Sequence, residues 1–494
     1  MRVWLPAALL AFAARWATGP HPIDDAYITF RYARNLAEGL GLVYNPGEWV
    51  LGTTTPLWAA ILALGDRLGF ADLATLATGV SAVCDAASAG ILASLAMRFT
   101  GRLPVAALVG MAWALNPMSI AFAVGGMETS LFVLACVSAL SLCAWGRYHL
   151  LAAALAGLSA LIRPEGLLLV GVVLGWRLLR DRRLPVVAAM VAASPVLGEG
   201  FLLVSQYGSP LPHSLAAKQV AYQGAWPLTN ALALVMQAGL PGWSTYLLAA
   251  VPAVVGLPLA LVGCATLVYL VRLGLPWVSS HGLAWQPFVG FAVLYAAFYA
   301  LVGLRGVRLF PWYLVPLVPF FLLGAAAGLA RLGRARAPWL AAAVLVWQLP
   351  AIDWQHAPLL PTGSSLWREA VLLDAGRELR ASLPPSAVVA APEIGALGYA
   401  SNLRILDTVG LVSPAALPYY PLSPEQLATD NAIPPRLIAD EKPEAVVTMD
   451  AFAERSLLRD AAFLAAYRLD RTYDAPVWAS QQLLVFIRRD AGAS

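Results

Sequence analysis

The chain has 494 residues, of which 60% are hydrophobic and 12% charged, and its mean hydropathy is +0.71. Soluble domains are about 45–50% apolar and about 25% charged, so this composition excludes an ordinary soluble protein and predicts a polytopic membrane protein. The formal net charge of +4 is not gathered into a basic tract, which argues against a nucleic-acid partner.

The four cysteines, Cys84, Cys136, Cys143 and Cys264, all lie in apolar segments. Because the sequence has neither a CxxC pair nor a Cys/His cluster, we expect buried free thiols, no disulfide and no zinc site. No other ligand cluster demands a metal, and no cofactor is expected.

The membrane-spanning segments are predicted from apolar runs, since a span needs about 20 mostly apolar residues. Residues 3–18 have one arginine before them and a poor cleavage site after them, which favours an uncleaved signal-anchor helix. We predict about eleven spans in total, near 3–18, 72–97, 103–123, 128–145, 149–162, 165–179, 185–204, 246–271, 286–303, 311–330 and 338–354.

The arginines of the short loops predict the orientation. They fall on alternate connections, at 98–102, 147, 177–183, 272 and 331–336. By the positive-inside rule these loops and the N-terminus are cytoplasmic. The opposite side then receives residues 19–71, 125–129, 163–166, 205–245, 305–311 and the C-terminal region.

Residues 356–494 differ from the rest, because charged residues become frequent and apolar runs shorten to the length of strands. The segments 365–382 and 451–467 have helical periodicity, whereas 387–391, 403–407, 444–449 and 482–487 are typical of buried strands. We therefore expect two domains, a transmembrane module over 1–355 and a soluble extracytoplasmic α/β domain over 356–494.

The predicted loop 19–71 opens with an acid pair, Asp24 and Asp25, directly after the first span. Asp25 suits the N-cap of an amphipathic helix over 26–38, and 56–68 predicts a second helix; both are expected to lie in the membrane interface. One interpretation of the pair is a capped, solvated helix start. The other is a carboxylate beside cationic groups such as Arg31, in which one acid serves as a general base.

Further candidate site residues lie in the segments assigned to the same side. Glu128 either complements a helix dipole or faces a shared cavity. Arg163 and Glu165 either form a surface pair, or the guanidinium binds a lipid phosphate.

Arg305 and Arg308 have the same placement before an aromatic run, where snorkelling to the interface is the alternative to phosphate binding. His213 and Lys218 lie in the loop 205–245, which is apolar enough to lie on the membrane over a lipid-donor groove. The C-terminal acids Glu393 and Asp407 end predicted strands, and ordinary loop roles compete with contacts to a glycan.

The stretch DDAYITFRYARNLAEGLGLVYNPGE, followed by TTTPLW, resembles the first external loop of bacterial GT-C glycosyltransferases that use polyprenyl-phosphate sugars. The similarity is closest to the subgroup of the mycobacterial terminal arabinofuranosyltransferase. Similar segments follow in the family order, at 125–132, 161–169, 207–218 and 393–414. One departure is the run 51–55, which lacks the acid and the aromatic residue typical of the subgroup.

The resemblance implies a multi-pass GT-C enzyme of the bacterial inner membrane in which Asp24 or Asp25 is catalytic. The expected reaction is an inverting transfer of sugar from a polyprenyl phosphate to a glycan, lipid or protein acceptor of the cell envelope. Two alternatives stay open: a transporter or flippase of lipid-linked sugars, and a non-catalytic glycan-binding scaffold. Internal repeats, which a transporter of this size predicts, are absent from the sequence.

Overall fold

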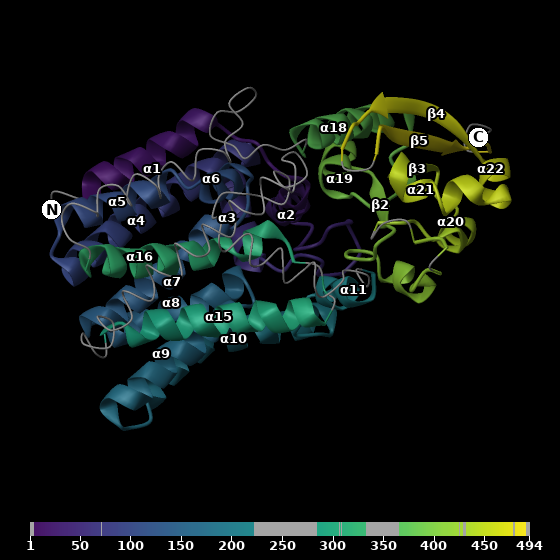
Figure 1. Ribbon diagram of the computed structural model, residues 1–494. Helices are drawn as coiled ribbons and strands as arrows, with labels where there is room; N and C mark the ends of the chain where they lie inside the picture. The colour runs from purple at the N-terminus through teal and green to yellow at the C-terminus, as the bar shows by residue number, and fades with distance from the viewer. Residues whose placement is uncertain are drawn as a thin grey trace.

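A computed structural model describes residues 4–70, 72–221, 284–305, 307, 309–331, 365–423, 425–427, 431–477 and 480–490. A helical bundle contains the N-terminus at its far end, and a smaller region with a β-sheet contains the C-terminus (Figure 1). The predicted spans 246–271 and 338–354, together with Cys264 and Arg308, lie outside the described residues.

Apolar helices build the bundle. They are α1 (Trp4–Thr18), α4 (Leu73–Thr100), α5 (Leu103–Ala114), α6 (Pro117–Val124), α7 (Thr129–Trp145), α8 (His149–Ile162), α9 (Gly166–Asp181), α10 (Val186–Tyr207), α15 (Gln286–Leu304) and α16 (Val318–Arg331). Among the described residues, α4, α10, α15 and the segment Pro311–Arg331 are long and apolar enough to cross a membrane. The pair α5–α6 makes a fifth if it is one broken span. The number of eleven stays a prediction.

Two predicted spans are not continuous helices. The segment 103–123 bends by 42° between α5 and α6, because Pro117 has no N–H and Asn116 instead caps α6 by accepting from the Ser119 amide at 2.9 Å. The segment 311–330 begins with two 3-10 turns, Pro311–Tyr313 and Val315–Leu317, before α16 starts.

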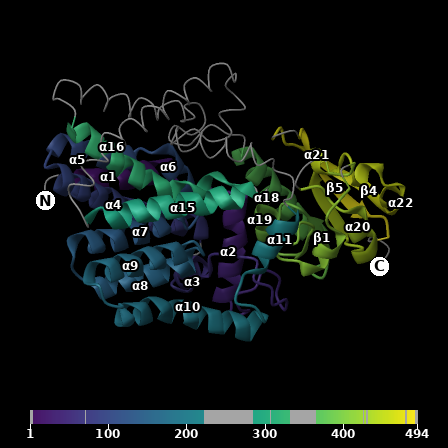
Figure 2. The ribbon, with the colours of Figure 1, turned by 60° about the horizontal axis from the view of Figure 1, so that its bottom comes forward.

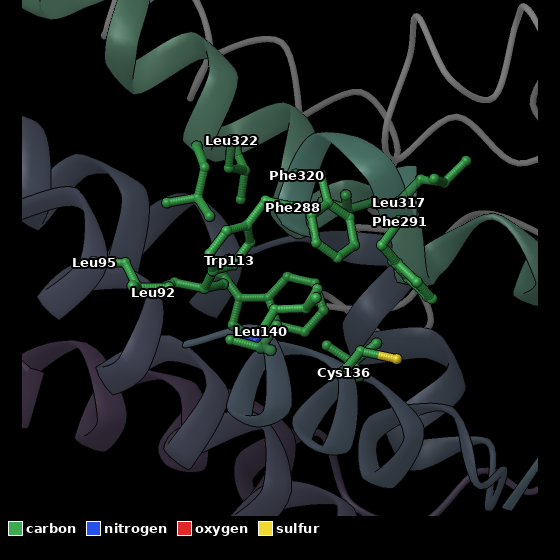
Figure 3. Packing of buried hydrophobic residues seen from close by; sticks show 14 of the residues in the cluster. Leu92, Leu95, Trp113, Cys136, Leu140, Phe288, Phe291, Leu317, Phe320 and Leu322 are labelled. Atoms are coloured by element: carbon green, nitrogen blue, oxygen red, sulfur yellow. The ribbon is translucent and has the colours of Figure 1, made fainter. Parts of the chain in front are cut away.

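The bundle has a packed interior and an apolar surface. Aromatic and aliphatic side chains of α4, α5, α7, α15 and α16 interdigitate in the main core, with Trp113 and Phe291 fully buried (Figure 3). On α10 the large apolar side chains point outward instead, and Phe201 is 75% exposed. Such a surface is unfavourable in water and suits contact with lipid tails.

Three shorter helices lie at one end of the bundle: α2 (Asp24–Ala37), α3 (Pro56–Arg67) and α11 (His213–Ala221). Helix α2 begins at Asp24 with Ile23 as its N-cap and without a side-chain cap, so the prediction that Asp25 is the N-cap was wrong. Ten of its fourteen residues are buried, which is more than one face of a helix lying in a membrane interface buries.

The C-terminal residues form a mixed five-stranded sheet in the order β2-β1-β3-β5-β4. Strands β2, β1 and β3 are parallel, and β5 pairs antiparallel with both β3 and β4. The strands are β1 (Val388–Ala391), β2 (Arg404–Asp407), β3 (Ala445–Met449), β4 (Tyr467–Asp474) and β5 (Gln482–Arg488), and the helices are α18 (Ser365–Ser382), α19 (Gly395–Ser401), α20 (Pro435–Glu441), α21 (Asp450–Ala453) and α22 (Ala461–Ala466). The helix predicted over 451–467 is thus broken into short turns that lead into β4.

Alternate side chains of each strand enter different cores. Val389 and Ala391 of β1 face a core shared with α18, α19 and the bundle-end helices α2 and α3, whereas Ala390 faces a second core with α20 and α22. Helix α2 therefore lies between the bundle and the C-terminal region (Figures 1 and 2). The separate domain predicted from residue 356 onward shares its interior with residues 23–80.

Candidate active site

The segments that the charge pattern assigns to one side of the membrane meet at one end of the bundle. The start of α7 contacts the α8–α9 turn through Glu128 and Arg163. That turn contacts Trp312 beyond α15, and the amides of His21 and Ile23 bond to the end of α6. Helix α11 joins them, because Lys218 lies over the ring of Phe310 at 5.9 Å. Every segment quoted for the family resemblance contributes to this region.

Glycines allow α2 to approach the bundle closely. A Cβ added at Gly126 would lie 2.8 Å from the Phe30 ring and 3.0 Å from Ala26, and Gly126 also has a positive φ of 79°. The Gly126 carbonyl accepts from Trp58 Nε1 of α3 at 3.1 Å. The sequence GGMETSLF thus places the acid pair at the start of α2 beside the start of α7.

The carboxylate of Asp24 is hydrogen-bonded within the protein. It accepts hydrogen bonds from the amides of Gly395 and Ala396, at 3.1 and 2.8 Å, where α19 begins. The Asp24 amide in turn donates to Glu369 Oε1 of α18 at 3.0 Å. With 7% of its surface exposed, Asp24 attaches α2 to the C-terminal region.

Asp25 has a different environment. Its side chain is half-buried, and in the part of the chain that the structure describes no hydrogen bond or ion pair holds its carboxylate. Burial raises the pKa of Asp25 and Asp24 adds to the rise, whereas Lys218 and Arg368 oppose it. A carboxylate with a raised pKa and no fixed partner is suited to accept a proton from a substrate.

Lys218 is the cation from the bundle side that acts on Asp25. Burial alone would lower its pKa, but Tyr313 and the Asp25 carboxylate raise the pKa above its ordinary value. The ammonium therefore stays charged among aromatic side chains. Its flexible stem suits binding of a phosphate as a point charge.

Arg163 is held within the protein. Its side chain is 3% exposed and pairs with Glu128 at 3.7 Å and Glu165 at 3.3 Å. It also donates to the carbonyl of Trp312 at 3.2 Å and the hydroxyl of Tyr299 at 3.3 Å. This internal pairing argues against phosphate binding by Arg163. It also argues against a substrate contact by Glu128 or Glu165, and both stay predictions.

Arg31 is also enclosed, at 1% exposure. Its guanidinium donates to the carbonyls of Tyr44, Gly398 and Leu403 at 2.8, 2.6 and 2.7 Å, and to Asn45 Oδ1 at 3.2 Å. These bonds link α2 to its own loop and to α19. Four of the five N–H donors of Arg31 are used in these bonds, so its substrate contact stays a prediction that this internal bonding argues against.

The remaining predicted residues make other contacts. His213 begins α11, where its amide donates to the Leu51 carbonyl at 2.8 Å. Burial lowers the pKa of its ring, which contacts the backbone of Gly410. Arg305 ends α15 and is exposed. Asp407 accepts from the amides of Val409 and Val412, at 2.9 and 3.0 Å, and so closes the loop after β2.

The structure joins the candidate Glu393 to Arg368 of α18, and sequence reasoning missed Arg368 and its neighbour Glu369. Arg368 pairs with Glu393 at 3.1 Å and with Glu369 through two guanidinium nitrogens. Burial raises the pKa of Glu393 to about 8, with Asp24 and Glu369 adding to it and Arg368 opposing. The adjacent Arg-Glu pair at the start of a predicted helix was the available signal, but the pattern resembles any solvated helix end.

A second missed cluster lies inside the bundle. Arg15 of α1 and Asp85 of α4 are fully buried and pair at 2.9 Å, with Ser119 bonded to both side chains. Arg15 also donates to the Trp113 and Ala114 carbonyls at the C-terminal end of α5. Intramembrane charges of this kind are rare and mark a specific role.

The described residues contain no group of three or more His, Cys, Asp or Glu that could hold a metal ion. Cys84, Cys136 and Cys143 are buried free thiols.

Comparisons with solved structures relate the fold of the chain to that of ArnT. The crystal structure of ArnT from Cupriavidus metallidurans bound to undecaprenyl phosphate matches with a TM-score of 0.57 at 14% identity, over 98% of this chain and 97% of that chain. Its apo state matches with a TM-score of 0.58 at 13% identity, over 97% of both chains. The chain thus shares the fold of ArnT, a GT-C glycosyltransferase, over nearly its whole length.

Two further matches are weaker. The structure of the arabinofuranosyltransferase AftD from mycobacteria aligns at 15% identity with 99% of this chain and 41% of that chain, at a TM-score of 0.44 that supports no argument. A family model described as a domain of unknown function (DUF8728) matches residues 364–486, about a quarter of the chain. A search of curated proteins gives no match. At these identities the likeness concerns the fold.

Proposed function

We propose that the protein is an inverting membrane glycosyltransferase that moves a sugar from a polyprenyl phosphate to an acceptor of the cell envelope, with Asp25 as its general base. The observation that carries the proposal is the contrast within the acid pair. Asp24 is bonded to α19, whereas the Asp25 carboxylate has no bonding partner in the described structure and lies near Lys218.

The donor class rests on the fold and on the charge of Lys218. The solved ArnT structure, which shares the fold, holds undecaprenyl phosphate. In this chain Lys218 is the cation near Asp25 that comes from the bundle, where a lipid donor would lie. Arg305 and Arg308 remain candidates for a second phosphate contact.

The reaction follows from these positions. Asp25 accepts the proton of the acceptor hydroxyl while that oxygen attacks the anomeric carbon. The bond from that carbon to the phosphate oxygen breaks, and polyprenyl phosphate leaves with its new charge near Lys218. Because attack and departure occur on opposite faces, the configuration inverts. Positioning and proton removal supply the catalysis, since phosphate is already a good leaving group.

We infer that the charge pattern gives the orientation as well, with a cytoplasmic N-terminus and the acid pair and sheet on the outer side of the plasma membrane. The gathering of the described parts of these segments at one end of the bundle supports this orientation. Among the described residues, polar groups gather at one end of the bundle, and the Arg15–Asp85 pair is enclosed within it, which favours an enzyme over a flippase.

The test is release of polyprenyl phosphate from a panel of polyprenyl-phosphate monosaccharides by purified protein. Asp25→Asn is expected to lower turnover by about 10²–10⁴-fold at unchanged thermal stability, as loss of a general base does. Asp24→Asn is expected to lower thermal stability, because the Asp24 carboxylate bonds to α19. Asp374→Asn, at a side chain 58% exposed on α18, is the matched control.

Full activity in Asp25→Asn would refute the assignment of the base. Absence of release with every donor by wild-type protein, together with movement of lipid-linked sugar across liposomes, would favour the transporter instead.

A further inference from the structure

The C-terminal region brings a charged side chain to the acid pair. Arg368 lies on α18, next to Glu369, which accepts from the Asp24 amide. Its Nη1 is 3.1 Å from Glu393 Oε1, and its Nε is 3.2 Å from Glu369 Oε1. Because these carboxylates hold the guanidinium, Arg368 is fixed beside the start of α2.

Two cations act on Asp25, and their partners differ. Lys218 comes from α11 and interacts with the side chain of Tyr313, whereas Arg368 is held by two buried carboxylates. The negative groups around Asp25 are Asp24 on α2 and Glu128 at the start of α7. When the phosphodiester of a donor binds Lys218, its single negative charge cancels the ammonium, and Arg368 is left to offset the surrounding carboxylates.

We propose that Arg368 is a positioning residue whose charge keeps the Asp25 carboxylate ionised once the donor phosphate has engaged Lys218. The C-terminal region would then supply part of the catalytic site, rather than a separate glycan-binding module. The role of Arg368 in turnover rests on the proposed function. Its effect on the protonation of Asp25 can be measured without turnover.

The carboxylates of Glu369 and Glu393 hold the guanidinium of Arg368 in place. Glu369 and Glu393 are 5% and 7% exposed, and each has a second carboxylate oxygen that is buried without a hydrogen-bond partner. Loss of the guanidinium would leave two buried carboxylates uncompensated, which is more costly than the pair itself is stabilising. We therefore expect Arg368 to act on Asp25 through space.

The experiment measures the protonation of Asp25 in the full-length purified protein. A hydrophobic carbodiimide modifies protonated carboxyl groups, and fragment mass spectra separate Asp25 from Asp24. The midpoint of Asp25 labelling against pH is compared among wild type, Arg368→Gln and Arg377→Gln. Arg377 is the matched control, because it lies on the same helix with a side chain 63% exposed and pairs only with Asp374 among the described residues.

Arg368→Gln is expected to move the midpoint upward by about one pH unit, since an opposite charge nearby lowers a carboxyl pKa by about 1–3 units. Arg377→Gln should match wild type. Arg368→Met, which also removes the charge, should move the midpoint in the same direction, and it provides a test should Arg368→Gln fail to fold. Equal midpoints in wild type, Arg368→Gln and Arg368→Met would overturn the proposal.

Turnover separates this inference from the proposed function. With an active wild type, the acidic limb of kcat/KM in Arg368→Gln should move upward in parallel with the labelling midpoint, and a limb that stays in place would overturn the proposal. Without sugar release by wild type the proposed function fails, and the labelling midpoints still decide the influence of Arg368 on Asp25.

Discussion

Replacement of Gly395 by alanine tests the attachment of α19 to α2. A Cβ at this position would lie 1.8 Å from the Asp24 carbonyl oxygen, 2.6 Å from its carbonyl carbon and 2.8 Å from Cγ. Since ordinary contacts begin near 3.4 Å, the backbone of Asp24 must retreat by more than 1 Å. No flexible side chain can absorb that movement, because the closest atoms belong to the start of a buried helix.

The magnitude follows from the bonds that this movement breaks. The Asp24 carboxylate accepts from the Gly395 and Ala396 amides at 3.1 and 2.8 Å. Hydrogen bonds to a charged group contribute about 1.5–3 kcal/mol each, and overpacking alone costs about 1–3 kcal/mol. We expect Gly395→Ala to weaken the attachment by about 3 kcal/mol or more.

Hydrogen–deuterium exchange of the purified protein measures this loss directly. A cost of about 3 kcal/mol lowers the protection of peptides covering α2 and α19 by about 100-fold. The control is Gly175→Ala in α9, where an added Cβ meets nothing within 4 Å. The reasoning would be refuted by a Gly395→Ala protein whose α2 and α19 amides exchange as slowly as those of Gly175→Ala.

Three further predictions concern stability, each measured as thermal unfolding in detergent. Burial raises the pKa of Glu393 to about 8, so the folded protein retains a proton that the unfolded chain releases, and stability falls as pH rises from about 4.5 to 8. Glu393→Gln should flatten this dependence. An unchanged slope of stability against pH would contradict the prediction. Asp85→Ala is expected to lower the free energy of unfolding by about 3–5 kcal/mol, because it leaves Arg15 unpaired. The double variant Arg15→Met with Asp85→Leu should lose less stability than the sum of its two single changes. Additive losses would show that the two side chains are not coupled. Arg31→Lys should cost about 2 kcal/mol or more, because an ammonium cannot reproduce four bonds of a planar fork; wild-type stability would show that the bonds are dispensable.

The sequence predicted local features well where one physical signal dominates. Helix α18 has the predicted bounds, and the four predicted strands fall on β1, β2, β3 and β5. Strand β4 was missed because the mostly exposed Tyr467–Asp474 has few apolar residues to signal a strand. The break at Pro117 was readable as a proline signal, but an apolar run of spanning length concealed it.

The candidate site shows the limit of reading a sequence alone. The pattern indicated the acid pair, but Asp24 and Asp25 are adjacent and equivalent in sequence, and they differ through amides 371 and 372 residues away. Arginines near the site were all plausible phosphate ligands by composition. Burial and pairing distinguish Arg31 and Arg163 from Lys218, and neither can be read from spacing along the chain.

The bonds between Asp24 and α19 have a consequence for the synthesis of the protein. The ribosome makes Asp24 before the described helices of the bundle that follow it, and its partners Gly395 and Ala396 after them. Until then the start of α2 has no cover, and the charge of Arg368 is absent. A chain cut short before α18 would therefore enter the membrane without the cover and the charge that the proposed site needs.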